Sequence, residues 1–255
     1  MPKSDDETLD RRPLHERMAA DLRDEIMSGD LPPASSLPST QRLKDRFGVS
    51  NATVQKALQI LKDERLAIGR AGASVTVREH QQETVRPADF GKPAEPGESY
   101  PWLTEATKRG KRGSIHLLSV GEVRPPRDVA HRLGLSEEGT AIVREQVLSH
   151  DGEPVELVSS YYPLELAQGT ALAEPRKIRG GTPALLAEMG HRPRLTVDRV
   201  SARVPTQKQY EALRLPTDLP ILRTLRVVYS DGDRPIEVTV MAKAGHLYEL
   251  QYEFE

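Results

Sequence analysis

A short segment of the chain carries polar side chains of the types that contact DNA bases. Asn51, Gln55 and Lys56 fall on the outward positions of a predicted helix. Amide side chains can hydrogen-bond the edge of adenine in the major groove, and a lysine can bind guanine or a phosphate. Thr53 and Gln59 share these outward positions. The segment therefore has the chemistry expected of a DNA recognition helix.

Positively charged and hydroxyl-bearing residues precede this segment. Arg42, Lys44 and Arg46 suit the phosphate backbone, which positions a protein on DNA without specifying a sequence. Ser39 and Thr40 are short hydroxyl donors of the kind that also bind phosphate. From these residues alone a second interpretation stays open, because a charged helix face is most often simply solvated.

No catalytic arrangement accompanies these residues. The seven histidines show no metal-ligand spacing such as H-E-x-x-H, and neither a G-x-S-x-G nor a G-x-x-x-x-G-K-[ST] motif occurs. The absence of cysteine excludes disulfides, thiolate metal sites and cysteine nucleophiles. We therefore predict a protein that is not an enzyme and that needs no metal or cofactor.

The elements that would position the polar residues follow from apolar spacing. Apolar residues four apart predict an amphipathic helix over 14–28. Ser39 or Thr40 can cap a second helix, Gly48 makes a tight turn, and Ser50 or Asn51 caps a third helix. Apolar triplets at 66–68 and 75–77 suit a two-stranded wing. The order predicts a winged helix-turn-helix.

A polar, proline- and glycine-rich stretch follows, with a strand expected where Tyr100 or Trp102 docks. Beyond it, alternating patterns predict a mixed α/β domain. The predicted strands are 115–123, 140–149, 154–162, 195–204, 221–229 and 235–242, and the predicted helices are 127–133, 182–189 and 206–213. We place the domain boundaries at 11–78 for the first domain, 79–97 for the linker and 98–255 for the second domain.

Two hairpins of the second domain resemble each other. In each, a strand with an arginine leads to an Asp-Gly turn and then to a strand that begins Pro-Val/Ile-Glu. Allowing one-residue gaps, Arg144 aligns with Arg223, Asp151 with Asp231, and Glu156 with Glu237. This layout predicts one sheet built from two similar halves, although a chance match of short hairpins remains an alternative.

The distribution of charge matters more than its sum. The 255 residues carry 36 Lys and Arg against 38 Asp and Glu, a net charge of −2 that argues against a nucleic-acid partner. Residues 39–78, however, hold eight bases and three acids, a local net charge of +5. No signal-peptide pattern and no run of about 18 apolar residues is present, so we expect a cytoplasmic protein without a membrane span.

The N-terminal motifs resemble the winged helix-turn-helix of the GntR family. They are Gly29-Asp30-Leu31-Pro32-Pro33, Leu37-Pro38-Ser39, Phe47-Gly48-Val49-Ser50 and Thr53-Val54-x-x-Ala57-Leu58, in the family's order and spacing. The resemblance adds Arg70 and Gly72 of the wing to the expected DNA contacts. The predicted DNA-binding residues are Ser39, Thr40, Gln41, Arg42, Lys44, Arg46, Ser50, Asn51, Thr53, Gln55, Lys56, Arg70 and Gly72.

The residues expected to contact bases depart from the family pattern. Thr40-Gln41 stands where the family often has Glu-Arg, and Asn51 and Gln55 flank Thr-Val where it often has arginine. Because arginine favours guanine and amides favour adenine, we expect an operator that depends less on guanine than the family's usual site.

The C-terminal region resembles the UTRA effector domain of the HutC branch of that family. The matching features are Arg144, Asp151-Gly152-x-Pro154-Val155, Ser160-Tyr161-x-Pro163, Asp231-Gly232-x-x-Pro235-Ile236-Glu237 and Tyr248-Glu249-Leu250. The resemblance implies a chorismate-lyase-like α/β fold, a small-molecule pocket and a homodimer. Val158 and Ala242-Lys243 depart from the family pattern, which predicts a different ligand or the loss of effector binding.

Five residues of this domain are candidates for effector binding. Arg144 and Arg223 can bind carboxylate or phosphate in a bidentate manner, and Ser160, Tyr161 and Glu237 can supply oriented hydrogen bonds. Such residues on strands are also often cross-strand or solvent-facing partners.

The sequence as a whole predicts an α+β protein that regulates transcription. The expected partners are a double-stranded, palindromic DNA operator, an unidentified small-molecule effector and a second copy of the chain, with no membrane. Repression released by the effector is the expected mode of action. The alternatives are a constitutive DNA-binding regulator whose second domain only dimerises, and a lyase-like enzyme.

Overall fold

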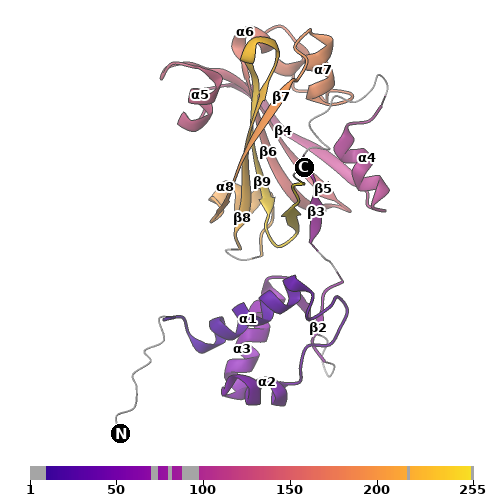
Figure 1. Cartoon of the computed structure of the whole chain (residues 1–255), viewed down its shortest axis with the longest axis vertical. Helices are drawn as coiled ribbons and strands as arrows, with labels where there is room; N and C mark the ends of the chain where they lie inside the picture. Colours follow the sequence, from indigo (N-terminus) through magenta and orange to yellow (C-terminus); the bar gives the residue numbers. More distant parts are fainter. Residues whose placement is uncertain (1–9, 70–73, 80–81, 88–97, 217–218, 254–255) are drawn as a thin grey trace. The chain divides into compact units, whose positions relative to one another are not determined.

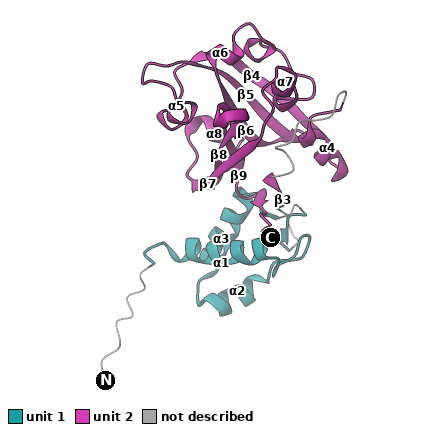
Figure 2. Ribbon diagram, turned by 45° about the horizontal axis from the view of Figure 1, so that its top comes forward, with its two compact units in different colours: residues 1–82 teal, residues 83–255 magenta. Residues whose placement is uncertain are grey.

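Residues 10–69, 74–79, 82–87, 98–216 and 219–253 are described by the computed structural model of this chain. The chain divides into two units, Met1–Gln82 and Glu83–Glu255, here called unit 1 and unit 2 (Figure 2). The division falls within the predicted linker 79–97, of which residues 80–81 and 88–97 lie outside the described part. Each unit has its own buried core, so each is treated separately below.

Unit 1 is a three-helix domain with a small wing (Figure 1). Its helices are α1 (Leu14–Ser28), α2 (Thr40–Phe47) and α3 (Asn51–Asp63), and its antiparallel strands are β1 (Ala67–Ile68) and β2 (Thr76–Val77). These are the predicted elements. Gly48 ends α2 with a φ of 62°, a conformation that glycine adopts without steric cost. The predicted wing contacts Arg70 and Gly72 lie outside the described residues.

The core of unit 1 comes from the inward faces of all three helices. The residues that it buries include Met18, Leu22, Leu43, Val54, Ala57, Leu58 and Leu61. Arg23 of α1 also binds the buried Glu64 at the end of α3, with 2.8 Å between Nε and Oε2 and 2.5 Å between Nη2 and Oε1. The buried stripe and this ion pair fix α3 on α1, so the opposite side of α3 is left to solvent.

Unit 2 is built on a six-stranded antiparallel sheet with the strand order β4-β5-β6-β9-β8-β7. The strands are β4 (Gly113–Val123), β5 (Ala141–His150), β6 (Glu153–Pro163), β7 (Leu195–Arg203), β8 (Ile221–Tyr229) and β9 (Pro235–Ala244). All six predicted strands are present. The sheet has two halves, β4-β5-β6 and β7-β8-β9, and in each half the chain runs strand, helix, strand, strand. The two halves meet where β6 pairs with β9. This is the arrangement that the sequence repeat predicts.

Helices cover both faces of the sheet (Figure 1). On one face pack α5 (Arg127–Leu133) and α8 (Gln207–Ala212). On the other lie α4 (Pro101–Lys108), α6 (Leu164–Ala167), the 3-10 turn η2 (Ala171–Ala173) and α7 (Thr182–Glu188). A second 3-10 turn, η3 (Asp231–Asp233), joins β8 to β9. Among the described residues, no helix is both long and apolar enough to cross a membrane.

Two features of unit 2 differ from the sequence expectation. The strand expected near Tyr100 or Trp102 is the helix α4, which has Pro101 in its first turn and buries Trp102 and Ala106 at helical spacing. The predicted linker contains β3 (Glu83–Val85), which pairs in parallel with β10 (Tyr248–Leu250) near the C-terminus. Both belong to unit 2.

Candidate functional sites

The exposed face of α3 presents the polar residues that the sequence singled out. Ser50 caps the helix, because its Oγ accepts a hydrogen bond from the backbone N–H of Thr53 at 3.2 Å. Asn51, Gln55 and Lys56 are exposed, and Thr53 is half-buried. Amides and an ammonium thus share one solvent-facing side of a rigid helix. This is the geometry that base contacts in a major groove require.

The neighbouring helix α2 supplies groups suited to the DNA backbone. The Oγ of Ser39 accepts from the backbone N–H of Arg42 at 3.3 Å and so caps the helix. Gln41 and Arg42 are exposed, whereas Thr40 and Lys44 are half-buried. The whole set of predicted residues within the described range lies on α2, α3 and their caps, so the structure brings it together in unit 1.

Arg46 differs from the other predicted phosphate ligands. Both of its terminal nitrogens bind the carboxylate of Glu25 on α1, with Nη1 at 3.1 Å from Oε2. Its guanidinium also lies 4.8 Å from the ring centroid of Phe47. The hydrogen bond that Arg46 donates to the Glu25 carboxylate raises the pKa of Arg46. Arg46 therefore holds α2 on α1, and a phosphate would have to compete with Glu25 for it.

Unit 2 encloses a cavity of about 620 Å³ between the sheet and the elements that cover one of its faces. Side chains alternate between the two faces of a strand, so every second residue of a strand points into this space. The strand residues that line it include Arg144 and Gln146 of β5, Glu156 and Ser160 of β6, Asp198 of β7, Thr224 and Arg226 of β8, and Glu237, Thr239, Met241 and Lys243 of β9.

Two ion pairs lie in the sheet wall of the cavity. Arg226 binds Asp198 in a bidentate manner, with both N–O distances at 2.7 Å. Lys243 Nζ lies 2.8 Å from Glu156 Oε1, and the two side chains are only 7% and 5% exposed. Lys243 is one of the sequence's departures from the family pattern, and its buried pair with Glu156 shows how the chain accommodates it. Removing one partner would leave the other charged and buried.

A hydrogen-bonded carboxyl group lies beside these pairs. Thr239 Oγ1 donates to Glu237 Oε1 at 2.5 Å, and the hydroxyls of Thr239 and Ser160 are 2.8 Å apart. Burial raises the pKa of Glu237, and the hydrogen bond from Thr239 opposes that shift. A carboxyl group that protonates more readily can donate as well as accept, so Glu237 can bind either a ligand hydroxyl or a ligand carbonyl.

Arg144 lines the cavity, but both of its terminal nitrogens already donate to backbone carbonyl oxygens. Nη1 donates to the carbonyl oxygens of Ala171 at 3.2 Å, Leu172 at 2.9 Å and Glu174 at 2.8 Å. Nη2 donates to the carbonyl oxygen of Arg176 at 2.7 Å. Burial lowers the pKa of this guanidinium. Arg144 thus anchors the loop that follows η2 instead of presenting a free guanidinium to a ligand.

Three cavity residues that the sequence reasoning missed have free polar groups. Within the described residues, the buried hydroxyl of Thr224 has no hydrogen-bond partner. Lys177 and Arg179 line the cavity from the loop before α7, and in the described part of the chain neither forms an ion pair. An unpaired buried hydroxyl destabilises a protein, so a ligand that bonds Thr224 would remove that cost.

Tyr161 and Arg223 lie on the opposite face of the sheet. Tyr161 packs in the cluster under α5, and Arg223 Nη2 donates to Asp128 of α5 at 2.6 Å. Of the five predicted effector residues, the structure therefore brings only Arg144, Ser160 and Glu237 into the cavity. Because a shift of one residue reverses the face of a strand side chain, Thr224 and not Arg223 points into the cavity.

A helix-turn-helix unit followed by a ligand-sized cavity in an α/β unit defines a DNA-binding transcriptional regulator with an effector domain. Residues 14–77 match the bacterial regulatory proteins of the gntR family. Residues 108–249, more than half of the chain, match the UTRA domain. The chain belongs to the GntR family and to its UTRA-containing branch.

Similar proteins match almost the whole chain. An uncharacterised HTH-type transcriptional regulator of Streptomyces coelicolor is 23% identical over 252 residues, which cover 96% of this chain and 94% of that protein. The HTH-type transcriptional regulator GgaR of Escherichia coli K12 is 23% identical over 244 residues, 94% of this chain and 90% of GgaR.

Solved structures share the fold. A GntR-family transcriptional regulator has a TM-score of 0.62 at 23% identity and covers 96% of this chain and 98% of its own. PhnF from Mycobacterium smegmatis has a TM-score of 0.57 at 21% identity and covers 93% and 99%. The α+β fold expected from the sequence is confirmed.

Proposed function

We propose that this regulator is a repressor that binds a palindromic operator as a homodimer and is released by a small molecule bound in the unit 2 cavity. The observation that carries the effector part is the unpartnered hydroxyl of Thr224 in the wall of that cavity. The exposed amides and ammonium of α3 support the operator part. Effector binding would favour a dimer arrangement that fits the two half-sites poorly, through different affinities for two states.

The charges of the cavity favour an organic anion with a polar body. Arg144, Lys177, Arg179, Arg226 and Lys243 line it, against Glu98, Glu156, Asp198 and Glu237. Most of these charges are committed to protein partners, as described above, whereas Lys177 and Arg179 form no ion pair within the described residues. A carboxylate or phosphate group would bind these two cations, and ligand hydroxyls would bind Thr224 and Glu237.

A constitutive regulator whose second unit only dimerises is the alternative. It gives the cavity and its unpartnered hydroxyl no role, and an unsatisfied buried hydroxyl is disfavoured unless something uses it. For this reason we favour the effector-responsive function. The relatives named above are regulators, which favours regulation over a lyase-like activity.

Genome-wide footprinting of the bound sites tests the operator proposal. A dimer with two recognition helices predicts inverted half-sites with centres roughly 34 Å apart if the helices enter adjacent major grooves. Half-sites rich in adenine–thymine pairs would match Asn51 and Gln55, whereas guanine-anchored half-sites would contradict the expected base preference. Isolated single half-sites would contradict dimer binding. The genes beside the sites would indicate which organic anions to test as effectors.

Replacing Thr224 with valine is expected to separate ligand binding from folding. Without ligand, the variant should be as stable as the parent or up to about 1 kcal/mol more stable, because an unpaired hydroxyl is removed. Binding of an effector that bonds this hydroxyl should weaken roughly tenfold, as expected for the loss of one hydrogen bond. Thermal unfolding with and without the effector measures both quantities.

Thr239→Val is the matched control. The Thr239 hydroxyl donates to Glu237, so its loss is expected to destabilise the ligand-free protein by about 1–3 kcal/mol. A ligand-free Thr224→Val variant that is destabilised as much as Thr239→Val would show that the Thr224 hydroxyl already has a partner in the folded protein.

A further inference from the structure

The strand β3 occupies a special place in the chain. It begins at Glu83, the first residue of unit 2, directly after the last residue of the DNA-binding unit. It lies outside the six-stranded sheet and pairs in parallel with β10 through three residue pairs, Glu83 with Tyr248, Thr84 with Glu249, and Val85 with Leu250. A two-stranded pair of this length is only marginally stable by itself. Other contacts must decide whether β3 stays docked on unit 2.

One set of docking contacts surrounds Glu83. Its Oε1 lies 3.0 Å from His150 Nδ1 and also binds Lys111 Nζ, and Arg109 lies within 3.9 Å of its second oxygen. The ring of Trp102 stacks on His150 with 4.6 Å between centroids. The first residue of the strand is thus held by polar and charged side chains that all belong to unit 2.

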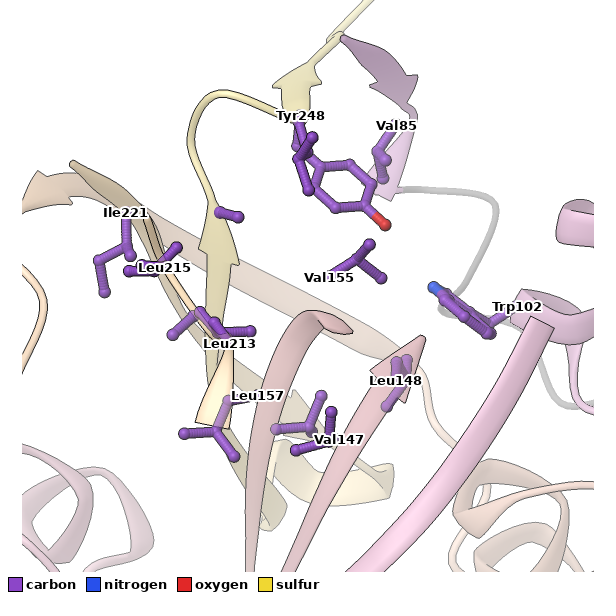
Figure 3. Packing of buried hydrophobic residues seen from close by; sticks show 14 residues of the cluster. Val85, Trp102, Val147, Leu148, Val155, Leu157, Leu213, Leu215, Ile221 and Tyr248 are labelled. Atoms are coloured by element: carbon purple, nitrogen blue, oxygen red, sulfur yellow. The ribbon is translucent and has the colours of Figure 1, made fainter. Parts of the chain in front are cut away.

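The second set of docking contacts belongs to the cavity itself. Val85, Pro87 and Leu250 are part of the cavity wall. Arg226, which binds Asp198 in the wall, also donates from Nη2 to the carbonyl oxygen of Pro87 at 3.4 Å. Figure 3 shows Val85 and Tyr248 side by side on the two short strands, in one buried cluster with Val155 and Trp102. A ligand in the cavity would therefore touch the segment that follows the DNA-binding unit.

We propose that the strand pair β3–β10 transmits occupancy of the cavity to the DNA-binding unit. The proposal rests on the effector function proposed above. A ligand gains its contacts with Val85, Pro87 and Leu250 only while β3 is docked, so binding shifts an equilibrium between docked and undocked β3 toward the docked state. Each undocked residue adds up to roughly 3.5 Å of reach. Docking therefore shortens the connection to unit 1. In a dimer, a shorter connection restricts the positions that the two DNA-binding units can take.

A disulfide across the strand pair tests the proposal without any ligand. The natural chain has no cysteine, so the variant Thr84→Cys/Glu249→Cys introduces a single possible pair at register partners. In the oxidised form, β3 is locked and operator affinity is expected to fall at least tenfold relative to the reduced form of the same protein. The two single-cysteine variants under the same oxidant are the controls. Equal operator affinity of the oxidised and reduced forms would overturn the proposal.

A second experiment, without DNA, tests whether filling the cavity favours docking of β3. It uses a group attached covalently inside the cavity. In Met241→Cys, the cavity thiol is labelled with sodium (2-sulfonatoethyl) methanethiosulfonate, which attaches an anionic sulfonate through a mixed disulfide and releases methanesulfinate. The amides of Glu83 and Gln251 bond the carbonyl oxygens of Leu247 and Val85 and so report docking of β3. Hydrogen exchange at these two amides is expected to slow at least fivefold on labelling.

Leu118→Cys, at an exposed position of β4, carries the same label as a control and should leave exchange at both amides unchanged. Unchanged exchange in labelled Met241→Cys would refute the transmission. This readout involves no operator, so a negative result would refute the transmission without refuting the proposed function. Footprinting tests the operator part of that function separately.

Discussion

Lys56→Ala is expected to weaken specific operator binding by about 10- to 100-fold. Lys56 is exposed beside Asn51 and Gln55 on α3, and one good base contact contributes roughly 1–3 kcal/mol. The proposed dimer would lose the contact in both half-sites, so a base contact at the lower end of this range, about 1 kcal/mol in each half-site, already weakens binding about 30-fold. Titration of labelled operator at one fixed salt concentration measures the change, because phosphate contacts make affinity strongly salt-dependent.

The measurement also distinguishes the two roles open to Lys56. If Lys56 binds a phosphate, binding to operator and to unrelated DNA should weaken together and the salt dependence should decrease. If it binds a base, only operator binding should weaken. Lys108→Ala, an exposed lysine of α4 in unit 2, controls for the loss of one charge. Parent-like operator binding by both Lys56→Ala and Gln55→Ala would show that the assigned recognition face is wrong.

Arg144→Met is expected to destabilise unit 2 by about 3–5 kcal/mol, because a buried group with several charge-assisted hydrogen bonds is lost. The four carbonyl oxygens between residues 171 and 176 lose their common donor, and the loop that they belong to loses its attachment to the sheet. Urea unfolding measures the change in the free energy of unfolding.

Arg223→Met is the matched control, because the two arginines align in the sequence repeat. Arg223 pairs with the partly exposed Asp128, a type of ion pair that contributes about 0–1 kcal/mol. A small effect for Arg144→Met, within about 1 kcal/mol of the parent, would contradict the anchoring role. That result would make Arg144 a candidate for effector binding again.

The sequence predicted the local elements well because their signals are local. Ser39 and Ser50 cap helices as expected, and the Asp-Gly turn at Asp151 joins two antiparallel strands. The pairing of β3 with β10 could not be found this way, since it joins three residues near position 84 to three near position 249. The helix α4 did leave a signal, namely Pro101 followed by Trp102 and Ala106 at helical spacing, but the surrounding proline-rich sequence obscured it.

To predict which residues line the cavity, one must know which face of the sheet each strand side chain points to. The sequence did not give this for two of the five predicted effector-binding residues, Tyr161 and Arg223. Arg223 and Thr224 are neighbours in sequence, yet only Thr224 points into the cavity. Arg144 does line the cavity, but its four carbonyl partners come from a loop whose path no motif indicates. Ser160 and Glu237 were predicted to lie near an effector, and the structure places their side chains within 3.5 Å of each other.

The meeting of the two sheet halves at β6 and β9 has a consequence for cleavage of the chain. A cut between residues 164 and 194, which separate β6 from β7, would leave two fragments, each with one bare edge strand that the other fragment covers. The buried Lys243 and Glu156 would then stand on different fragments, each an uncompensated charge. The fragments should therefore reassemble with each other, and their reassembly should be a sensitive assay for variants along the β6–β9 boundary.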